Sequence, residues 1–277
     1  FAGDTFNTVW YTKMLRPDWS TSFVSRIGQD PISDDMLNMM VAHGVDVTHV
    51  QRSAEKTIGL YLISLKDGER SFAYWRSQSA ARHFADNPAL VATATDGADV
   101  LFFSGITMAI LAPAARNALL GILEAARAAG STIVFDPNLR PKLWSDTDEM
   151  RDTIMGAAAI SDIILPSFDE EAEHFGDVNQ AATVARYQSV GSASVILKNG
   201  PGAIYFSYCG QTGQVVPDPV TSIIDTTSAG DSFNSGLITG LAHYGSVEDA
   251  VRMAGRVARQ VIGQRGALVP LDLGDIF

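Results

Sequence analysis

The sequence predicts an α/β protein with a largely parallel central sheet and a small accessory layer of antiparallel strands. From about residue 98 onward, short apolar segments alternate with longer segments of helical spacing, as in parallel sheets that helices cover on both faces. Strands are expected at Val100–Phe103, Thr132–Phe135, Ile163–Leu165 and Val195–Leu197. Helices are expected at Pro113–Ala129, Asp148–Ala159, Asp169–Phe175, Asn179–Val190, Ala229–Tyr244 and Val247–Gly263.

The first fifty residues predict two helices with a short strand between them. Residues 4–15 place apolar side chains at helical spacing behind an aspartate that is suited to cap a helix. A short apolar strand is expected around residues 23–27. The second helix is expected over residues 31–43, because Pro31 opens it and Gly44 follows it.

The next segment predicts an antiparallel hairpin. Thr57–Leu65 is rich in β-branched and apolar residues, Ser71–Arg76 alternates, and Asp67-Gly68 between them favours a tight turn. A hairpin does not readily join a parallel sheet. We therefore expect residues 56–78 to form an accessory layer beside the main sheet.

Composition excludes several classes of protein. The 277 residues carry 20 Lys and Arg against 31 Asp and Glu, a net charge of −11, which disfavours a nucleic-acid binder because clustered cations hold phosphate backbones. The 46% hydrophobic and 18% charged fractions are typical of a globular protein. The longest uncharged apolar stretch, Val100–Ala115, is too short and too polar for a membrane span. The single cysteine, Cys209, permits a reducing compartment, so a cytoplasmic location is expected.

Polar segments follow three of the predicted strands, at residues 136–140, 198–202 and 225–231. Ligands of open α/β sheets bind beyond the carboxyl ends of the strands, so these segments are the candidate site loops. The third is the most informative, because it runs directly into a strong helical pattern.

Asp231 stands in the first turn of that helix, directly after the small residues Ser228, Ala229 and Gly230. Such a loop leaves backbone N–H groups unpaired at a helix N-terminus, which is an anion site. A carboxylate beside a bound anion makes sense where it takes a proton from an attacking hydroxyl, as in phosphoryl transfer. On spacing alone, the alternative that Asp231 only caps the helix and Gly230 only permits the turn stays open.

The order Asp225-Thr226-x-x-Ala229-Gly230-Asp231 resembles the carboxyl-terminal signature of the ribokinase/PfkB carbohydrate kinases, Asp-Thr-x-x-Ala-Gly-Asp. The start, Ala2-Gly3-Asp4-x-x-Asn7, resembles the family's substrate loop, Gly-Gly-x-x-x-Asn, with Ala2 in place of the first glycine. The resemblance implies a single ribokinase-like domain over residues 1–277, a three-layer α/β/α fold with a mostly parallel sheet. Residues 56–78 would form its β lid. The family's first strand has no counterpart, and the sequence begins with Phe1, so a preceding segment is expected to be missing.

Several segments resemble the kinases of 2-keto-3-deoxygluconate within that family: Gly3–Thr8, Gly59-Leu60-Tyr61, Gly68–Trp75 with Arg76, Asn138–Trp144 and Arg265-Gly266-Ala267. This resemblance implies transfer of the γ-phosphoryl group of ATP to the 6-hydroxyl of 2-keto-3-deoxygluconate, giving 2-keto-3-deoxy-6-phosphogluconate. Asp231 would act as base, and the amides of Ala229 and Gly230 would form the anion hole. Mg²⁺ would bridge the phosphates of ATP.

The substrate is a sugar acid, so its binder should offer cations, and Arg76 and Arg140 are suited to grip a carboxylate. Without the resemblance, Arg76 is a solvated hairpin end. The resemblance implies that further residues contact the sugar; these are Gly3, Asp4, Asn7, Tyr61, Tyr74 and Asp231. Taken alone, each tyrosine is a packed, half-buried aromatic, and Asn7 is a surface helix residue.

The segment after the strand at Val195–Leu197 is a candidate for binding the nucleotide. The resemblance implies nucleotide contacts by residues of three loops: Asn138, Lys198, Asn199, Gly200, Gly202, Ser228, Ala229 and Gly230. Read without the family, residues 198–202 are a turn between two strands. The family's Asn-x-x-Glu element, linked to magnesium, falls at residues 167–170, where Glu170 matches and Ser167 replaces Asn. Glu170 is therefore expected to act on the metal indirectly.

Two rival functions remain open at this stage. One is another PfkB sugar kinase, fructokinase-like or specific for the galacto epimer; Arg76 and Arg140 speak against a neutral sugar. The other is a non-catalytic sugar-binding relative, against which the intact segment 225–231 speaks. A Walker-type loop is missing from the sequence, which excludes a P-loop kinase. The edge of the lid strands offers a surface through which the chain is expected to form a homo-oligomer.

Overall fold

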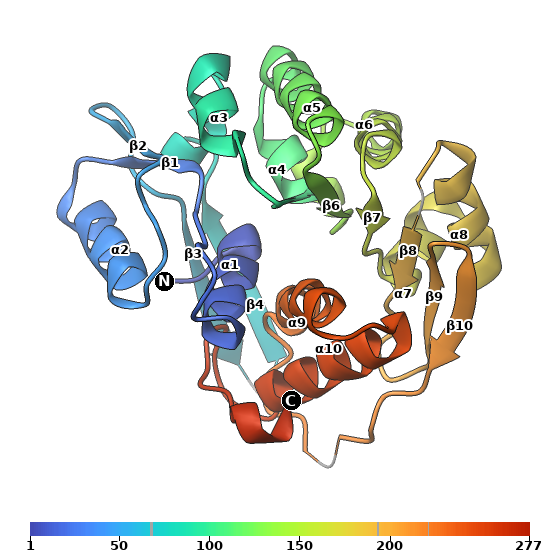
Figure 1. Cartoon of the computed structure of the whole chain (residues 1–277). Coiled ribbons are helices and arrows are strands. Elements are labelled where there is room, and N and C mark those ends of the chain that lie inside the picture. Colours follow the sequence, from blue (N-terminus) through green and yellow to red (C-terminus); the bar gives the residue numbers. More distant parts are fainter. Residues whose placement is uncertain (67–68, 193, 221) are drawn as a thin grey trace.

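A computed structural model describes residues 1–66, 69–192, 194–220 and 222–277, and side chains outside residues 62–74. Six strands form the main sheet in the order β10-β9-β8-β7-β6-β5 (Figure 1). The four strands predicted from the sequence are parallel to one another: β5 (Val100–Ser104), β6 (Thr132–Asp136), β7 (Ile163–Ile164) and β8 (Ser194–Leu197). An antiparallel hairpin, β9 (Ile204–Tyr208) and β10 (Gln211–Val215), completes one edge. The turn between two strands expected at residues 198–202 joins β8 to β9, whereas β10 was not predicted.

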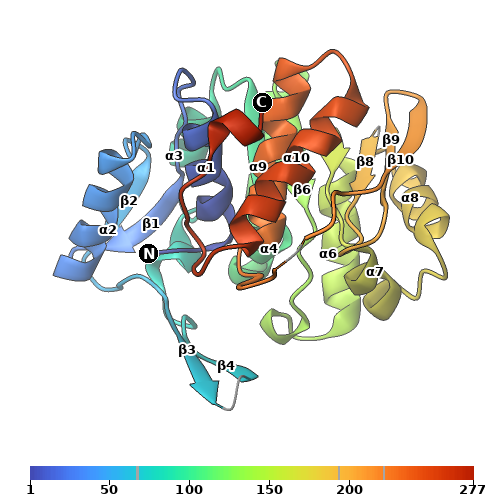
Figure 2. The same ribbon diagram turned by 90° about the horizontal axis from the view of Figure 1, so that it is seen from below.

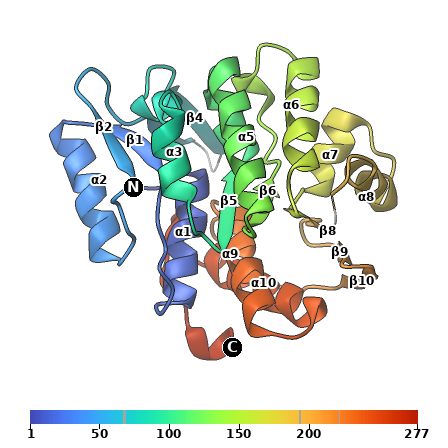
Figure 3. The same ribbon diagram turned by 45° about the horizontal axis from the view of Figure 1, so that its top comes forward.

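Helices cover the sheet on both faces (Figures 1 and 3), which gives the three-layer arrangement predicted. One face carries α3 (Pro88–Thr95), α4 (Gly105–Ile110), α5 (Pro113–Ala128), α6 (Thr147–Ala159), α7 (Phe168–Phe175) and α8 (Gln180–Ser189). The other carries α1 (Asp4–Leu15), α9 (Ala229–His243) and α10 (Val247–Ile262). Each face has its own buried apolar cluster, Ile133 and Phe135 facing one side and Val134 the other. That alternation along β6 is what a doubly covered strand requires. Short 3₁₀ turns lie at Ala80–His83, Pro141–Leu143 and Leu273–Asp275.

Helices α9 and α10 pack unusually closely, because α9 presents glycines to its neighbour. A Cβ placed on Gly236 would lie 2.8 Å from the Cα of Ala254, and one on Gly240 would lie 2.9 Å from the Cα of Ala250. Only residues without a side chain fit at such approaches. The packing fixes α9, which carries Asp231 in its first turn.

The amino-terminal region forms a second, separate sheet. Parallel strands β1 (Ser25–Gly28) and β2 (Val50–Ser53) pair with each other and flank α2 (Pro31–Ala42). Strands β1 and β5 line the same cavity of about 1880 Å³, but among the described residues they do not pair. The prediction that a family strand is absent from the sequence stays a prediction.

The predicted hairpin is present as β3 (Leu60–Lys66) and β4 (Glu69–Trp75), antiparallel in the register Leu60 opposite Trp75. Figure 2 shows it projecting away from the body of the protein. The predicted turn, Asp67-Gly68, lies outside the described residues. Its role as a lid stays a prediction. No helix among the described residues is long and apolar enough to cross a membrane.

Candidate active site

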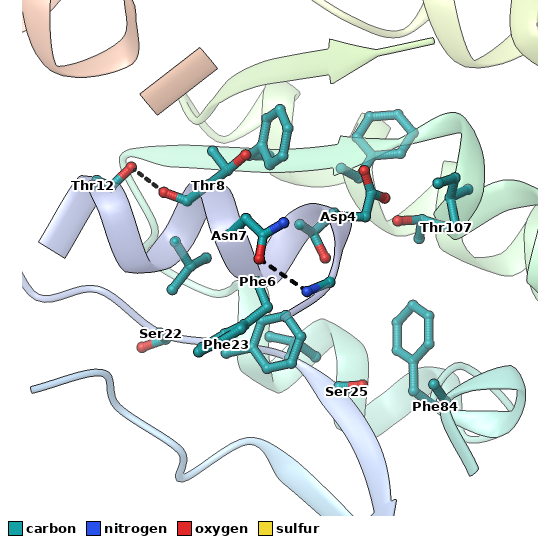
Figure 4. A pocket seen from close by; sticks show the side chains of 18 of the residues that line it. Asp4, Phe6, Asn7, Thr8, Thr12, Ser22, Phe23, Ser25, Phe84 and Thr107 are labelled. Carbon is teal, nitrogen blue, oxygen red and sulfur yellow. Dashed lines mark hydrogen bonds between the residues drawn. The ribbon is translucent and has the colours of Figure 1, made fainter. Parts of the chain in front are cut away.

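Helices α1 and α9 bring the two predicted signature segments together. The Nδ2 of Asn7 donates to Oδ2 of Asp231 at 2.7 Å, and the hydroxyl of Thr8 donates to the carbonyl of Asp231 at 3.2 Å. Asn7 is itself fixed, because its Oδ1 accepts from the amide of Gly3 at 2.9 Å (Figure 4). Asn7 is only 4% exposed, so the sequence-based alternative of a surface helix residue is wrong.

The first turn of α9 has the geometry expected of an anion site. Ser228 precedes the helix at φ 67°, a left-handed conformation, and the helix starts at Ala229. The hydroxyl of Ser228 donates to Oδ2 of Asp231 at 3.2 Å. The leading amides of a helix have no intrahelical partners, so this end attracts negative charge. The amide of Ala229, one of the two predicted anion-hole amides, donates to the carbonyl of Thr226 at 3.2 Å in this structure.

Asp231 lies partly buried beside that helix end. Burial is the main cause that raises its pKa from 3.8 to about 6, and the charge of Asp136 adds to it, while hydrogen bonds from Asn7 and Ser228 oppose it. At neutral pH the carboxylate is therefore largely ionised, yet more basic than an exposed aspartate. These are the properties of a general base.

A second, partly buried carboxyl group, that of Asp4, lies at the start of α1. Its oxygens accept from the hydroxyl of Ser104, at the end of β5, and from Nδ2 of Asn138 at 2.5 Å. Burial first, and then the charges of Asp231 and Asp136, raise the pKa of Asp4 from 3.8 to about 7. Figure 4 shows Asp4 beside Thr107 at the edge of the cavity.

Asp136 is a residue of the candidate site to which the sequence analysis gave no role. It lies at the end of β6 in a polar segment predicted to line the site. Its Oδ2 accepts from Nζ of Lys198 at 3.0 Å and from Nδ2 of Asn234 at 2.6 Å. The signal in the sequence was an aspartate directly after a buried apolar strand, where parallel sheets place their ligand-binding groups.

The predicted metal-linked residue, Glu170, is tied to the loop after β6. Its Oε1 accepts from Arg140 at 2.5 Å, and its Oε2 accepts from the amide of Leu139 at 3.1 Å. Both oxygens are engaged, so Glu170 fits an indirect role toward magnesium better than direct ligation. Within the described part of the chain, no group of three or more His, Cys, Asp or Glu side chains is arranged to hold a metal.

Six of the predicted sugar-binding residues meet at one cavity, whereas Asp231 is not among the residues that line it. Gly3, Asp4, Asn7, Tyr61, Arg76 and Arg140 all line it, as do residues 225–228. Arg76 comes from the foot of the hairpin, where its Cβ lies 3.0 Å from the position of a Cβ on Gly59. A side chain on Gly59 would crowd Arg76. The side chain of Tyr74 lies outside the described residues.

The predicted nucleotide loop, residues 198–202, connects β8 to β9. Gly200 has a positive φ of 50°, and the amide of Gly202 donates to the carbonyl of Asn199 at 2.7 Å. Lys198 joins this loop to the first turn of α9, because its Nζ lies 3.7 Å from the position of a Cβ on Gly230. Asn138 bonds to Asp4, on the side of the site where α1 begins.

A family model described as pfkB family carbohydrate kinase matches residues 1–273. The chain belongs to the PfkB carbohydrate kinase family. It is 37% identical over 276 residues to a 2-dehydro-3-deoxygluconokinase of Haemophilus influenzae, covering 97% of this chain and 88% of that protein. It is 34% identical over 280 residues to the enzyme of the same name from Escherichia coli K12, covering 98% and 91%.

Solved structures of PfkB proteins have the same fold. A PfkB protein from Polaromonas superposes with a TM-score of 0.80 at 28% identity, covering 92% of this chain and 83% of that one. A putative ribokinase II from Escherichia coli, in complex with ATP and Mg²⁺, superposes with a TM-score of 0.81 at 21% identity, covering 94% and 82%. The family and the ribokinase-like fold expected from the sequence are thus confirmed.

Proposed function

We propose that this PfkB protein is an ATP-dependent 2-dehydro-3-deoxygluconokinase. It transfers the γ-phosphoryl group of ATP to the 6-hydroxyl of 2-keto-3-deoxygluconate and releases ADP and the 6-phosphate. The names of the relatives support the substrate. The observation that carries the chemistry is the partly buried carboxylate of Asp231, held by Asn7 at the amino-terminal end of α9.

Proton transfer to Asp231 activates the acceptor. The 6-hydroxyl loses its proton to the carboxylate as its oxygen forms a bond to the γ-phosphorus, and the bond from that phosphorus to the leaving oxygen of ADP breaks. The amides of Ala229 and Gly230 stabilise negative charge on the phosphoryl group. Magnesium, when bound, would be held mainly by the phosphates of ATP with Glu170 acting indirectly, and it would neutralise charge on the nucleotide. Asp231 returns its proton to solvent after the product leaves.

The sugar acid binds between α1, the hairpin foot and the loop after β6. Arg76 and Arg140 supply positive charge for its carboxylate, and both line the cavity with Tyr61. Tyr74 belongs to the same proposal through its place in the hairpin. Gly3, Asp4 and Asn7 face the sugar from the first turn of α1.

The nucleotide occupies the side of Asp231 that faces residues 198–202. Lys198, whose Nζ lies beside Gly230, supports this placement. The loop residues Asn199, Gly200 and Gly202 and the turn at Ser228 surround the same end of α9. Asn138 belongs to this proposal as a bridge, since it bonds to Asp4 while its own amide donates to Asp136.

The hairpin also supports a homo-oligomer. Leu60 and Trp75 are directly paired across β3 and β4 and are 60% and 58% exposed, a costly exposure for large apolar side chains. Pairing of two hairpins would bury them. Size-exclusion chromatography with light scattering should give a dimer for the native chain and a monomer after Leu60→Ser with Trp75→Ser. A native monomer would refute this proposal.

ATP as phosphoryl donor and the lone cysteine support a cytoplasmic location.

A coupled assay of ADP release across several sugars tests the function. We expect the highest kcat/KM with 2-keto-3-deoxygluconate, a lower value with its galacto epimer, and at least tenfold lower values with fructose and ribose. A preference for fructose would identify a fructokinase instead. If no sugar released ADP above the background hydrolysis of ATP, the protein would be a non-catalytic relative.

A further inference from the structure

Asp136 is a buried carboxylate that the proton transfer to Asp231 does not use. It is 4% exposed and stands at the carboxyl end of β6. Besides the amide of Asn138, which donates to Oδ1 at 3.1 Å, it receives the ammonium of Lys198 and the amide group of Asn234 on Oδ2. A buried charge is costly unless it is paired, so this carboxylate and ammonium depend on each other.

Lys198 is held from two sides. Its Nζ lies 3.0 Å from Oδ2 of Asp136 and 3.2 Å from Oδ1 of Asn234, and these two groups are bonded to each other. The ammonium lies 3.7 Å from the position that a Cβ on Gly230 would occupy. Gly230 belongs to the helix end that receives the transferring phosphoryl group.

We propose that Asp136 is a positioning residue: together with Asn234 it holds the ammonium of Lys198 beside Gly230, where the γ-phosphoryl group lies during transfer. This proposal rests on the proposed function. A lysine side chain has four rotatable carbon–carbon bonds and a strongly hydrated head. Fixing it in advance removes the cost of ordering it at the moment of transfer, which is how preorganised charge lowers a barrier.

The role predicts a coupling between two substitutions. Asp136→Asn keeps the size of the side chain and loses the charge, and Lys198→Met removes the ammonium. We expect each to lower kcat by about 10- to 100-fold, as is typical for groups that orient a catalytic charge, with the KM for the sugar acid changing less than about threefold. When Asp136→Asn is added to Lys198→Met, kcat should fall by less than about a further threefold. Losses that multiply independently would overturn the proposal.

Nucleotide binding gives a readout that does not require sugar turnover. ADP lacks the γ-phosphoryl group, whereas the non-hydrolysable analogue AMP-PNP carries it. By calorimetry, Asp136→Asn should weaken AMP-PNP binding about tenfold and leave the affinity for ADP within about twofold, because the ammonium of Lys198 is no longer held beside the γ-phosphoryl group. An equal loss for both nucleotides, or none for either, would overturn the proposal. If the native chain phosphorylated no sugar, the proposed function would fail, while this ratio of affinities would still test Asp136.

Asp162 provides the matched control. It forms a carboxylate–cation pair with Arg127 at 2.8 Å. It directly precedes β7, and so lies at the opposite end of the parallel strands from Asp136. Asp162→Asn should lower the melting temperature without changing the ratio of AMP-PNP to ADP affinity; a changed ratio would overturn the selectivity argument. If Asp136→Asn does not fold, Asn234→Ala removes the other group that holds the ammonium and must show the same selective loss of AMP-PNP binding. Equal effects on both nucleotides would again overturn the proposal.

Discussion

Replacing Asp4 with asparagine should flatten the pH dependence of stability of the ligand-free protein. Burial and neighbouring charge raise the pKa of Asp4 from 3.8 to about 7, so at pH 5.5 folding takes up a proton that the unfolded chain lacks. The stability that this proton provides is present at low pH and is lost as pH rises through 7. At 1.36 kcal/mol per pKa unit, Asp4 alone removes about 2 kcal/mol of stability between pH 5.5 and 8.

Asp4→Asn preserves the shape of the protonated carboxyl group and keeps groups that bond to Ser104 and Asn138. Urea denaturation followed by tryptophan fluorescence, at pH 5.5 and pH 8, measures the free energy of unfolding. That free energy should fall about 2 kcal/mol less in Asp4→Asn than in the native chain. The exposed Asp18, whose pKa is lowered by Arg16, is the control: Asp18→Asn should leave the pH dependence unchanged. Parallel pH curves for Asp4→Asn and the native chain would refute the argument.

Three further predictions concern substrate, base and fold. Arg76→Ala should raise the KM for the sugar acid about 10- to 100-fold, the usual effect of a lost charge-assisted hydrogen bond, and should spare a neutral hexose; an equal effect on both would argue against a carboxylate contact. Because the pKa of Asp231 is about 6 and a base must be ionised, kcat/KM should fall tenfold per pH unit below about 6; a flat profile down to pH 5 would contradict this. Gly240→Val should lower stability by about 1–3 kcal/mol through its clash with Ala250, and calorimetric scanning should show no such loss for Gly121→Val, where nothing lies within 4 Å.

Periodicity and local signals were sufficient to predict most elements of the fold. The predicted helices and strands agree with the structure to within about three residues at each end, and helix α2 begins at Pro31 behind Asp30, whose side chain accepts from the amide of Ser33 at 3.0 Å. Strand pairing was harder to predict, because it depends on contacts far apart in sequence. The antiparallel edge formed by β9 and β10 and the separate sheet of β1 and β2 are of this kind.

In the site, too, individual residues could be predicted, whereas most contacts between distant residues could not. Asp231 and Asn7 were expected at the site from their segments, and they bond to each other across 224 residues. The links from Asp136 to Lys198 and from Asn138 to Asp4 were not foreseen. Each joins the ends of different elements, so their geometry depends on how β6, β8 and α1 are arranged around the sheet. A linear sequence pattern carries no distance between such groups.

Single-turnover ADP release by Asp231→Asn, with 2-keto-3-deoxygluconate and ATP both saturating, tests the central claim most directly. General bases contribute about 10²- to 10⁴-fold to the rate, so we expect turnover to fall by that factor. The dissociation constant of the sugar acid should stay within about threefold, since the asparagine still accepts from Asn7. Near-normal turnover by a correctly folded Asp231→Asn would contradict the assignment of Asp231 as the base.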